Sequence, residues 1–147
     1  MGRSSTAATA IAYLDGPRLL QGISAGVQQV FRRRNYLNKI NVFPVPDGDT
    51  GTNLAFTFKT VLDATVGARH ERVDELMAQI AEAALDGARG NSGAIMAQYF
   101  HGFSESISGQ RLLTPKSMAR ASTAGSAAAW KAMSTPVPGT LPTVLED

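Results

Sequence analysis

Two aspartates separated by a single glycine, Asp47 and Asp49, are the strongest candidates for chemistry in this 147-residue sequence. They lie in a loop that reads Asn41-Val-Phe-Pro-Val-Pro-Asp-Gly-Asp-Thr-Gly-Thr-Asn53. Two carboxylates this close on a proline-stiffened loop repel each other unless a cation lies between them. Mg²⁺ suits such a site because it needs few protein oxygens and completes its coordination with water and phosphate. We therefore predict a metal site at Asp47 and Asp49.

Two other interpretations of this loop remain open. Asp47 and Asp49 would also be explained by a turn that caps the following helix, which is common for an isolated Asp-Gly-Asp. A hydrolase with Asp47 and Asp49 as its acid–base pair is the second alternative. Adjacent side chains on one short loop are, however, poorly placed to flank a scissile bond.

Three loop-to-helix junctions rich in glycine and hydroxyl residues indicate where an anion would bind. A helix N-terminus offers unpaired backbone N–H groups and the positive end of the helix dipole, which favour phosphate. Each junction is also explained as an ordinary cap or turn, with Asn91 or Ser92 capping the second and Thr140 the third. Gathered at one end of a bundle, the three would face one polyanion. The candidate residues are Thr50, Gly51, Thr52 and Asn53, then Gly90, Asn91, Ser92 and Gly93, and finally Gly139 and Thr140.

The elements that position these junctions are predicted to be helices. Apolar residues recur every three or four positions through most of the chain, whereas the prolines between Val42 and Pro46 argue against a central strand. Asp15 and Thr114, each close to a proline, have the composition of helix caps. The expected helices cover residues 17–37, 52–65, 72–85, the stretch between Gly93 and Gly109, and 115–133, and a sixth starts at Thr140.

Composition and length narrow the class of protein. The chain is 44% hydrophobic, which suits one domain, and its net charge of +2 does not indicate a nucleic-acid partner. It has no cysteine, so disulfides and zinc–thiolate sites are excluded, and no apolar run approaches the roughly 20 residues of a membrane span. We expect a flexible leader over residues 1–13, a cytoplasmic location, and a domain over residues 14–147 that lacks its last helices. Exposed apolar faces would then favour a homo-oligomer.

The segment from Asn41 to Asn53 resembles the signature of the DhaL-type, or DAK2, domain. In its proline-rich form it is similar to the N-terminal ATP-binding domain of bacterial fatty acid kinase. The stretches 87–93 and 136–143 resemble the glycine loop and the late Gly-Thr segment of the same family. This resemblance implies an all-α antiparallel barrel of eight helices, with ATP or ADP and two Mg²⁺ ions at one end. In the dihydroxyacetone-kinase branch three aspartates hold the metals; Asp47 and Asp49 match two, and Asn41 lies near the third position with altered spacing.

The resemblance also implies a reaction. A fatty acid, presented by a separate fatty-acid-binding protein, would receive the γ-phosphate of ATP and become an acyl phosphate. The sequence shows no catalytic base, and a carboxylate acceptor does not need one because it is already ionised. Two alternatives stay open: a module that binds nucleotide without transferring phosphate, and a subunit of dihydroxyacetone-kinase type, against which the proline-rich signature argues.

Overall fold

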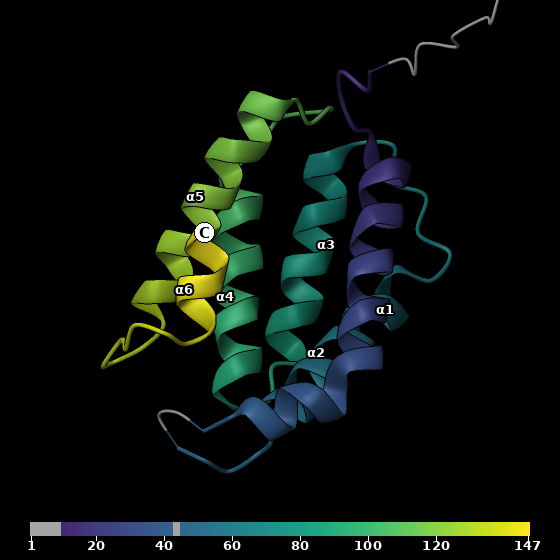
Figure 1. The fold of residues 1–147 in the computed structure, drawn as a ribbon. Coiled ribbons are helices and arrows are strands. Elements are labelled where there is room, and N and C mark those ends of the chain that lie inside the picture. Colours follow the sequence, from purple (N-terminus) through teal and green to yellow (C-terminus); the bar gives the residue numbers. More distant parts are fainter. Residues whose placement is uncertain (1–9, 43–44) are drawn as a thin grey trace, which may run out of the picture.

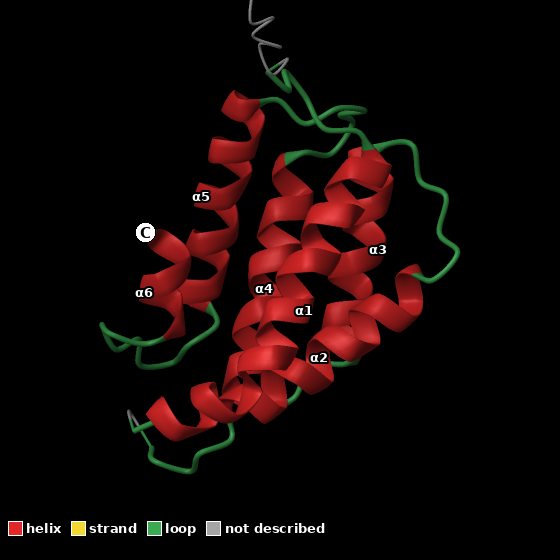
Figure 2. Ribbon diagram, turned by 45° about the vertical axis from the view of Figure 1, so that its right-hand side comes forward, coloured by secondary structure: helices red, strands yellow, loops and turns green. Residues whose placement is uncertain are grey.

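The computed structural model describes residues 10–42 and 45–147, and the described part is built from six helices that run alternately in opposite directions (Figures 1 and 2). The only β-type pairing in it is an isolated antiparallel bridge between Leu14 and Leu113. The prediction of an all-helical fold is therefore confirmed. Most of the predicted leader, residues 1–9, and Phe43 and Pro44 of the signature lie outside the described residues. The helices are α1 (Gly16–Ile40), α2 (Thr50–Thr65), α3 (Val73–Asp86), α4 (Gly90–Ser106), α5 (Pro115–Lys131) and α6 (Leu141–Glu146).

Local capping explains where two of these helices begin. The Asp15 carboxylate accepts a hydrogen bond from the backbone N–H of Arg18 at 3.0 Å, and Pro17 lies in the first turn of α1. Thr114 and Ser117 form a reciprocal capping box at the start of α5. Both caps confirm the prediction made from the sequence.

The start of α6 differs from the prediction. Thr140 occupies the N-cap position, but its hydroxyl donates to the carbonyl of Val137 at 2.7 Å and does not cap the helix. The hydroxyl of Thr143 accepts a hydrogen bond from the Gly139 N–H at 2.9 Å. The turn before α6 is thus held from both sides, by one hydroxyl that donates and another that accepts.

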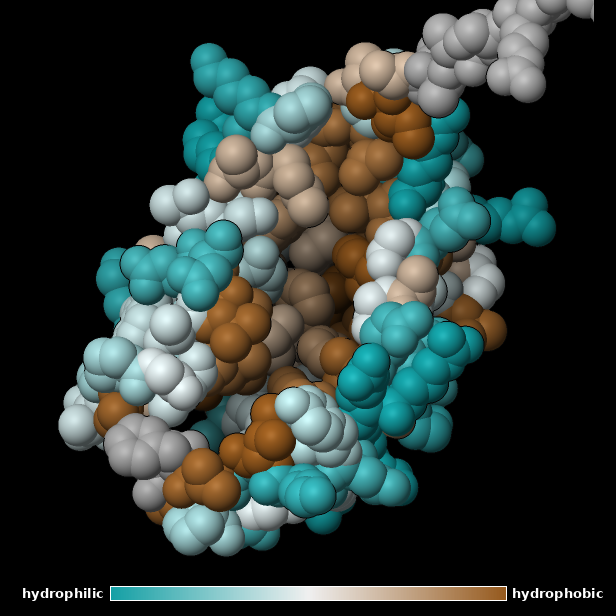
Figure 3. All heavy atoms as spheres, viewed as in Figure 1, coloured by the Kyte–Doolittle hydropathy of each residue, from teal (hydrophilic) through white to brown (hydrophobic). Residues whose placement is uncertain are grey.

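Helix α3 packs against three other helices, α1, α2 and α4. Its Leu76, Met77 and Ile80 are almost completely excluded from solvent. The two outer sides of the bundle are separate from each other. Helix α5 packs on α4 and α6, whereas α1 packs on α2 and α3 and makes no contact with α5. The space-filling view shows an apolar hollow between these two sides (Figure 3). No helix among the described residues combines the length and apolarity that crossing a membrane requires.

The end of the bundle where α1, α3 and α5 begin is joined by backbone hydrogen bonds. Leu14 and Leu113 exchange a pair of 2.8 and 2.9 Å, and the Val73 N–H donates to Arg111 at 3.0 Å. Arg72 forms two hydrogen bonds to the Asp74 carboxylate, from Nε at 3.0 Å and from Nη2 at 2.8 Å. This guanidinium is the main reason why the pKa of Asp74 is lowered, and Asp74 in turn raises the pKa of Arg72. The three loops at this end therefore form one connected unit.

Candidate functional site

A pocket of about 500 Å³ lies at the opposite end of the bundle, where α2, α4 and α6 begin. One part of its lining is polar and comes from all three junctions that the sequence singled out. The rest is an apolar wall. The polar part consists of Asn41, Asp47, Asp49, Thr50, Asn53, Gly90, Asn91, Ser92, Gly139 and Thr140, and the wall consists of Leu37, Ile40, Val45, Leu54, Ile95, Met133, Leu141 and Val144.

Three of the residues predicted to contact a ligand, Gly51, Thr52 and Gly93, do not line the pocket. A Cβ on Gly51 would collide with the carbonyl of Arg34, and one on Gly93 would collide with the hydroxyl of Thr57. These two glycines therefore permit close contact between helices. Thr52 bonds to α1 through both its N–H and its hydroxyl. In this structure the three residues hold the neighbouring helices together next to the pocket and do not contact its interior.

The carboxylates of Asp47 and Asp49 are exposed at the pocket and have no hydrogen bond or ion pair with any described residue. Asp49 occupies the N-cap position of α2, but its side chain does not cap the helix. The alternative in which these aspartates serve as caps is therefore not what the structure shows. Among the described residues, no group of three or more acidic, histidine or cysteine side chains is placed so that it could hold a metal ion. Two carboxylates without a cationic partner nevertheless suit Mg²⁺, whose remaining positions are filled by water and phosphate.

The first turn of α2 is capped by Asn38 of α1 and by Asn41, the C-cap residue that follows α1. The side-chain oxygen of Asn41 accepts hydrogen bonds from the N–H groups of Asp49 and Thr50, both at 3.2 Å, and from the Thr50 hydroxyl at 2.8 Å. The oxygen of Asn38 accepts from the Thr52 N–H at 3.0 Å. The prediction that the N–H groups opening α2 are available to a phosphate is wrong for these three, because α1 already supplies their acceptors.

The first turn of α4 has the opposite character. The N–H groups of Gly90, Asn91 and Ser92 have no hydrogen-bond partner among the described residues, and all three residues line the pocket. The helix starts at Gly90, so the alternative with Asn91 or Ser92 as its cap is wrong. Its N-cap residue, Arg89, forms no side-chain cap. Three unpaired N–H groups at the positive end of a 17-residue helix form a site for an anion.

Side chains connect the two junctions across the pocket. The Ser92 hydroxyl donates to the carbonyl of Thr50 at 3.3 Å. Behind it, the hydroxyl of Thr57 donates to Asn53 at 3.0 Å and accepts from the Arg89 N–H at 3.2 Å. Asn53 is only 8% exposed, yet its side-chain amide makes no hydrogen bond to the described residues. An amide that lines the pocket without a partner is available to a polar ligand.

Sequence reasoning missed Asn38, Thr57 and the apolar wall. The spacing of Asn38 and Asn41, three residues apart at the end of α1, could have indicated that both side chains face the same neighbour. Thr57 gave no such signal, because a threonine inside a helix is common. The wall comes from helices α1, α2, α4 and α6 and from the loops after α1 and α5, so its members cannot be grouped without the fold.

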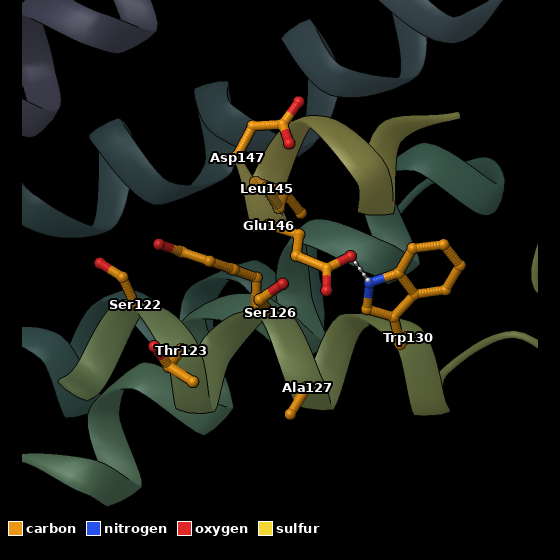
Figure 4. Close-up of a pocket in the computed structure, with 9 residues that line it drawn as sticks. Ser122, Thr123, Ser126, Ala127, Trp130, Leu145, Glu146 and Asp147 are labelled. Carbon is orange, nitrogen blue, oxygen red and sulfur yellow. Dashed lines mark hydrogen bonds between the residues drawn. The ribbon is translucent and has the colours of Figure 1, made fainter. Parts of the chain in front are cut away.

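A second pocket of about 570 Å³ lies between α5 and α6 and contains none of the predicted residues (Figure 4). The Trp130 Nε1–H donates to the carboxylate of Glu146 at 3.1 Å, and Asp147 lies beside it. The hydroxyl of Ser126 is buried there without a partner among the described residues. None of the three glycine-rich junctions contributes to this lining, whereas all three line the first pocket, so the first pocket is the candidate site.

Comparison with known proteins identifies the family of this chain. Residues 44–147 match the model of the DAK2 domain. The chain is 40% identical over 143 residues to Protein YloV of Bacillus subtilis, and 36% identical over 137 residues to an uncharacterised protein of Staphylococcus saprophyticus. In both comparisons 93% of this chain is covered, but it spans only 25% of the relative's length. The chain belongs to the DAK2-domain family and is a nucleotide-binding module of dihydroxyacetone-kinase type.

Proposed function

We propose that the pocket binds ATP together with Mg²⁺ and presents the γ-phosphate for transfer. The observation that carries this proposal is the arrangement of charge in a single pocket. Two carboxylates without cationic partners, Asp47 and Asp49, share it with the unpaired N–H groups of Gly90, Asn91 and Ser92. A nucleotide with its metal satisfies both groups at once, whereas a bare anion would be repelled by the aspartates and a bare cation would leave the N–H groups unpaired.

Each part of the lining then has a distinct task. Asp47 and Asp49 would hold Mg²⁺, which neutralises charge on the phosphates when it is bound. The first turn of α4 would position the phosphate oxygens, with the amide of Asn53 as a further donor. The apolar wall, which includes Leu54, Ile95 and Leu141, would exclude water and contact the base. Phosphoryl transfer needs positioning and neutralisation of charge more than covalent help, and this lining supplies both.

For the acceptor we propose a fatty acid presented by a separate fatty-acid-binding protein, with an acyl phosphate as the product. The similarity of the proline-rich signature to fatty acid kinase supports this. A binding module without transfer activity and a dihydroxyacetone-kinase-type subunit are the two alternatives. A phosphate-transfer assay with the fatty-acid carrier, without it, and with dihydroxyacetone distinguishes the three.

The binding step is tested by calorimetry with ADP. We expect binding in Mg²⁺ and a loss of at least about tenfold in affinity with excess chelator, because Asp47 and Asp49 then repel the phosphates. Asp47→Asn and Asp49→Asn should each reduce affinity in Mg²⁺ by a similar factor. The control is Asp63→Asn, which removes only a surface partner of Lys59. Equal affinity with and without metal would contradict the proposal.

A further inference from the structure

We infer that Asn41 and Asn38 are positioning residues, which hold the loop of Asp47 and Asp49 in shape before any ligand arrives. Asn41 is then not the third metal ligand that its place in the signature implied. This inference rests on the proposed function, because it concerns the same pocket. It is carried by hydrogen bonds that leave the side chain of Asn41 no free acceptor.

The side chain of Asn41 is fully used. Its oxygen accepts from the Asp49 N–H, the Thr50 N–H and the Thr50 hydroxyl, at 3.2, 3.2 and 2.8 Å. An amide oxygen has two lone pairs, so three donors already exceed its usual capacity. The amide nitrogen donates to the carbonyl of Val45 at 3.1 Å. For this oxygen to reach a cation, it would first have to release the start of α2, which carries Asp49.

Asn38 repeats the arrangement one turn earlier in α1. Its oxygen accepts from the Thr52 N–H at 3.0 Å and its nitrogen donates to the Thr52 hydroxyl at 2.9 Å. Asn38 lies in the last turn of α1 and Asn41 directly follows the helix, and the side chains of both bond to the start of α2. Gly51 allows this short approach, because any Cβ there would meet the backbone of Arg34. Together the two side chains satisfy three of the N–H groups that open α2.

The arrangement has a direct consequence for the metal loop. The Asn41 side chain bridges Val45, before the aspartates, and Asp49 itself. It thereby closes the loop across the position of Asp47. Two carboxylates that must lie close together repel each other in the absence of a cation. Hydrogen bonds to neutral groups fix the loop when the chain folds, despite the repulsion between the carboxylates. Ordering the loop then reduces the free energy of ligand binding less.

The first arm of the test uses amide hydrogen exchange, followed by NMR on the full chain without metal or nucleotide. In Asn41→Ala the amides of Asp49 and Thr50 should exchange about tenfold faster or more than in the parent, because their acceptor is gone. Asn41→Asp keeps the oxygens and should restore slow exchange. Asn38→Ala should accelerate Thr52 alone. Asn35→Ala is the matched control, an exposed asparagine on α1 that makes no side-chain hydrogen bond to the described residues.

The second arm adds Mg²⁺–ADP. In the parent, the amides of Asp49 and Thr50 should stay as slow as before or become slower. If Asn41 were a ligand, its oxygen would leave α2 and the two amides would exchange faster, which would overturn the inference even if Asn41→Ala does not fold. Calorimetry should show roughly tenfold weaker Mg²⁺–ADP binding for Asn41→Ala, as for other residues that orient metal ligands.

The outcomes separate this inference from the proposed function. Unchanged exchange at Asp49 and Thr50 in metal-free Asn41→Ala overturns the positioning role, whatever the nucleotide does. Faster exchange together with parental Mg²⁺–ADP affinity overturns its importance for the site. If the parent does not bind Mg²⁺–ADP, the proposed function fails, while the metal-free exchange still decides whether the asparagines hold the loop.

Discussion

Gly90 combines two constraints at a single residue of the pocket. Its φ of +62° lies in the left-handed region, and a Cβ there would collide with the side chain of Asn53. Any other residue would therefore strain the backbone and disturb a buried amide at the same time. Because the N–H of Gly90 also opens the anion site, we expect this position to tolerate substitution less than its neighbour Ser92.

The prediction at this scale is an ordering of affinities for Mg²⁺–ADP. Gly90→Val should weaken binding by more than about tenfold, because a branched side chain disfavours positive φ and displaces Asn53. Ser92→Ala removes one hydroxyl, which bonds to Thr50 at 3.3 Å, and should cost roughly 0.5–1.5 kcal/mol. Gly109→Val is the control, since Gly109 has a similar φ of +81° but lies at the other end of the bundle. Calorimetry in which Gly90→Val binds like the parent would place the phosphates elsewhere.

The sequence correctly predicted most polar residues that line the site, but it did not predict what each of them does there. Asp47, Asp49, Gly90 and Ser92 stand out locally, because glycine, hydroxyl and carboxylate residues gathered in a loop are unusual. The hydrogen-bond partners of the site residues could not be predicted from the sequence. A bond such as the one from the Thr52 N–H to Asn38 joins residues that are far apart in the chain. Residue type therefore indicated where the site is, but not which N–H groups are free in it.

Helices α4 and α5 form the most extensive helix pair, and glycines make their close contact possible. A Cβ added at Gly125 would lie 2.8 Å from the carbonyl oxygen of Tyr99, and one at Gly102 would lie 2.7 Å from that of Ala124. Such distances are too short for any side chain. Gly102 on α4 and Gly125 on α5 therefore serve helix packing.

Gly125→Val should lower the free energy of unfolding by about 1–3 kcal/mol, because the added side chain forces α4 and α5 apart. Thermal denaturation should then show a melting temperature lower by several degrees. Gly26→Ala on α1 makes a matched comparison: nothing lies within 4 Å of the added methyl group, and it should stabilise the helix by about 0.5–1 kcal/mol. Parental stability for Gly125→Val would mean that the two helices are not packed this closely.

Apolar spacing predicted that the helices exist, and the caps predicted the starts of α1 and α5, whereas the starts of α2 and α4 were not predicted correctly. The residues from Gly90 to Gly93 were expected to form a loop, because glycine is unfavourable inside helices. In the structure they form the first turn of α4, since Gly93 must lie against Thr57 and Gly90 must adopt a positive φ. Likewise α2 begins at Thr50 rather than Thr52, because the side chain of Asn41 supplies its cap. Distant partners decide such boundaries.

At the scale of the whole molecule, the pair of Arg72 and Asp74 links stability to pH. The pKa of Asp74 is lowered in the folded chain, so its contribution is fully present above its ordinary value of 3.8 and is lost as the pH falls through the lower folded value. Asp74→Asn should therefore melt below the parent near about pH 7, and the difference should shrink in acid. Asp63→Asn, at a surface pair, should change little at any pH. A constant difference between parent and Asp74→Asn would contradict this assignment.

One end of the bundle mainly stabilises the fold and the other carries the pocket, which affects how the sequence of such a domain can evolve. Backbone bonds around Leu14, Val73 and Leu113 secure one end, and the buried face of α3 secures the middle. Much of the polar lining at the other end contributes little to the core. Mutations that alter what the pocket accepts can therefore accumulate without unfolding the chain, so long as Asn38, Asn41 and the close-packed glycines are kept. New specificity can therefore evolve through the exposed side chains of the pocket, while the residues that hold its shape and the rest of the bundle stay under constraint.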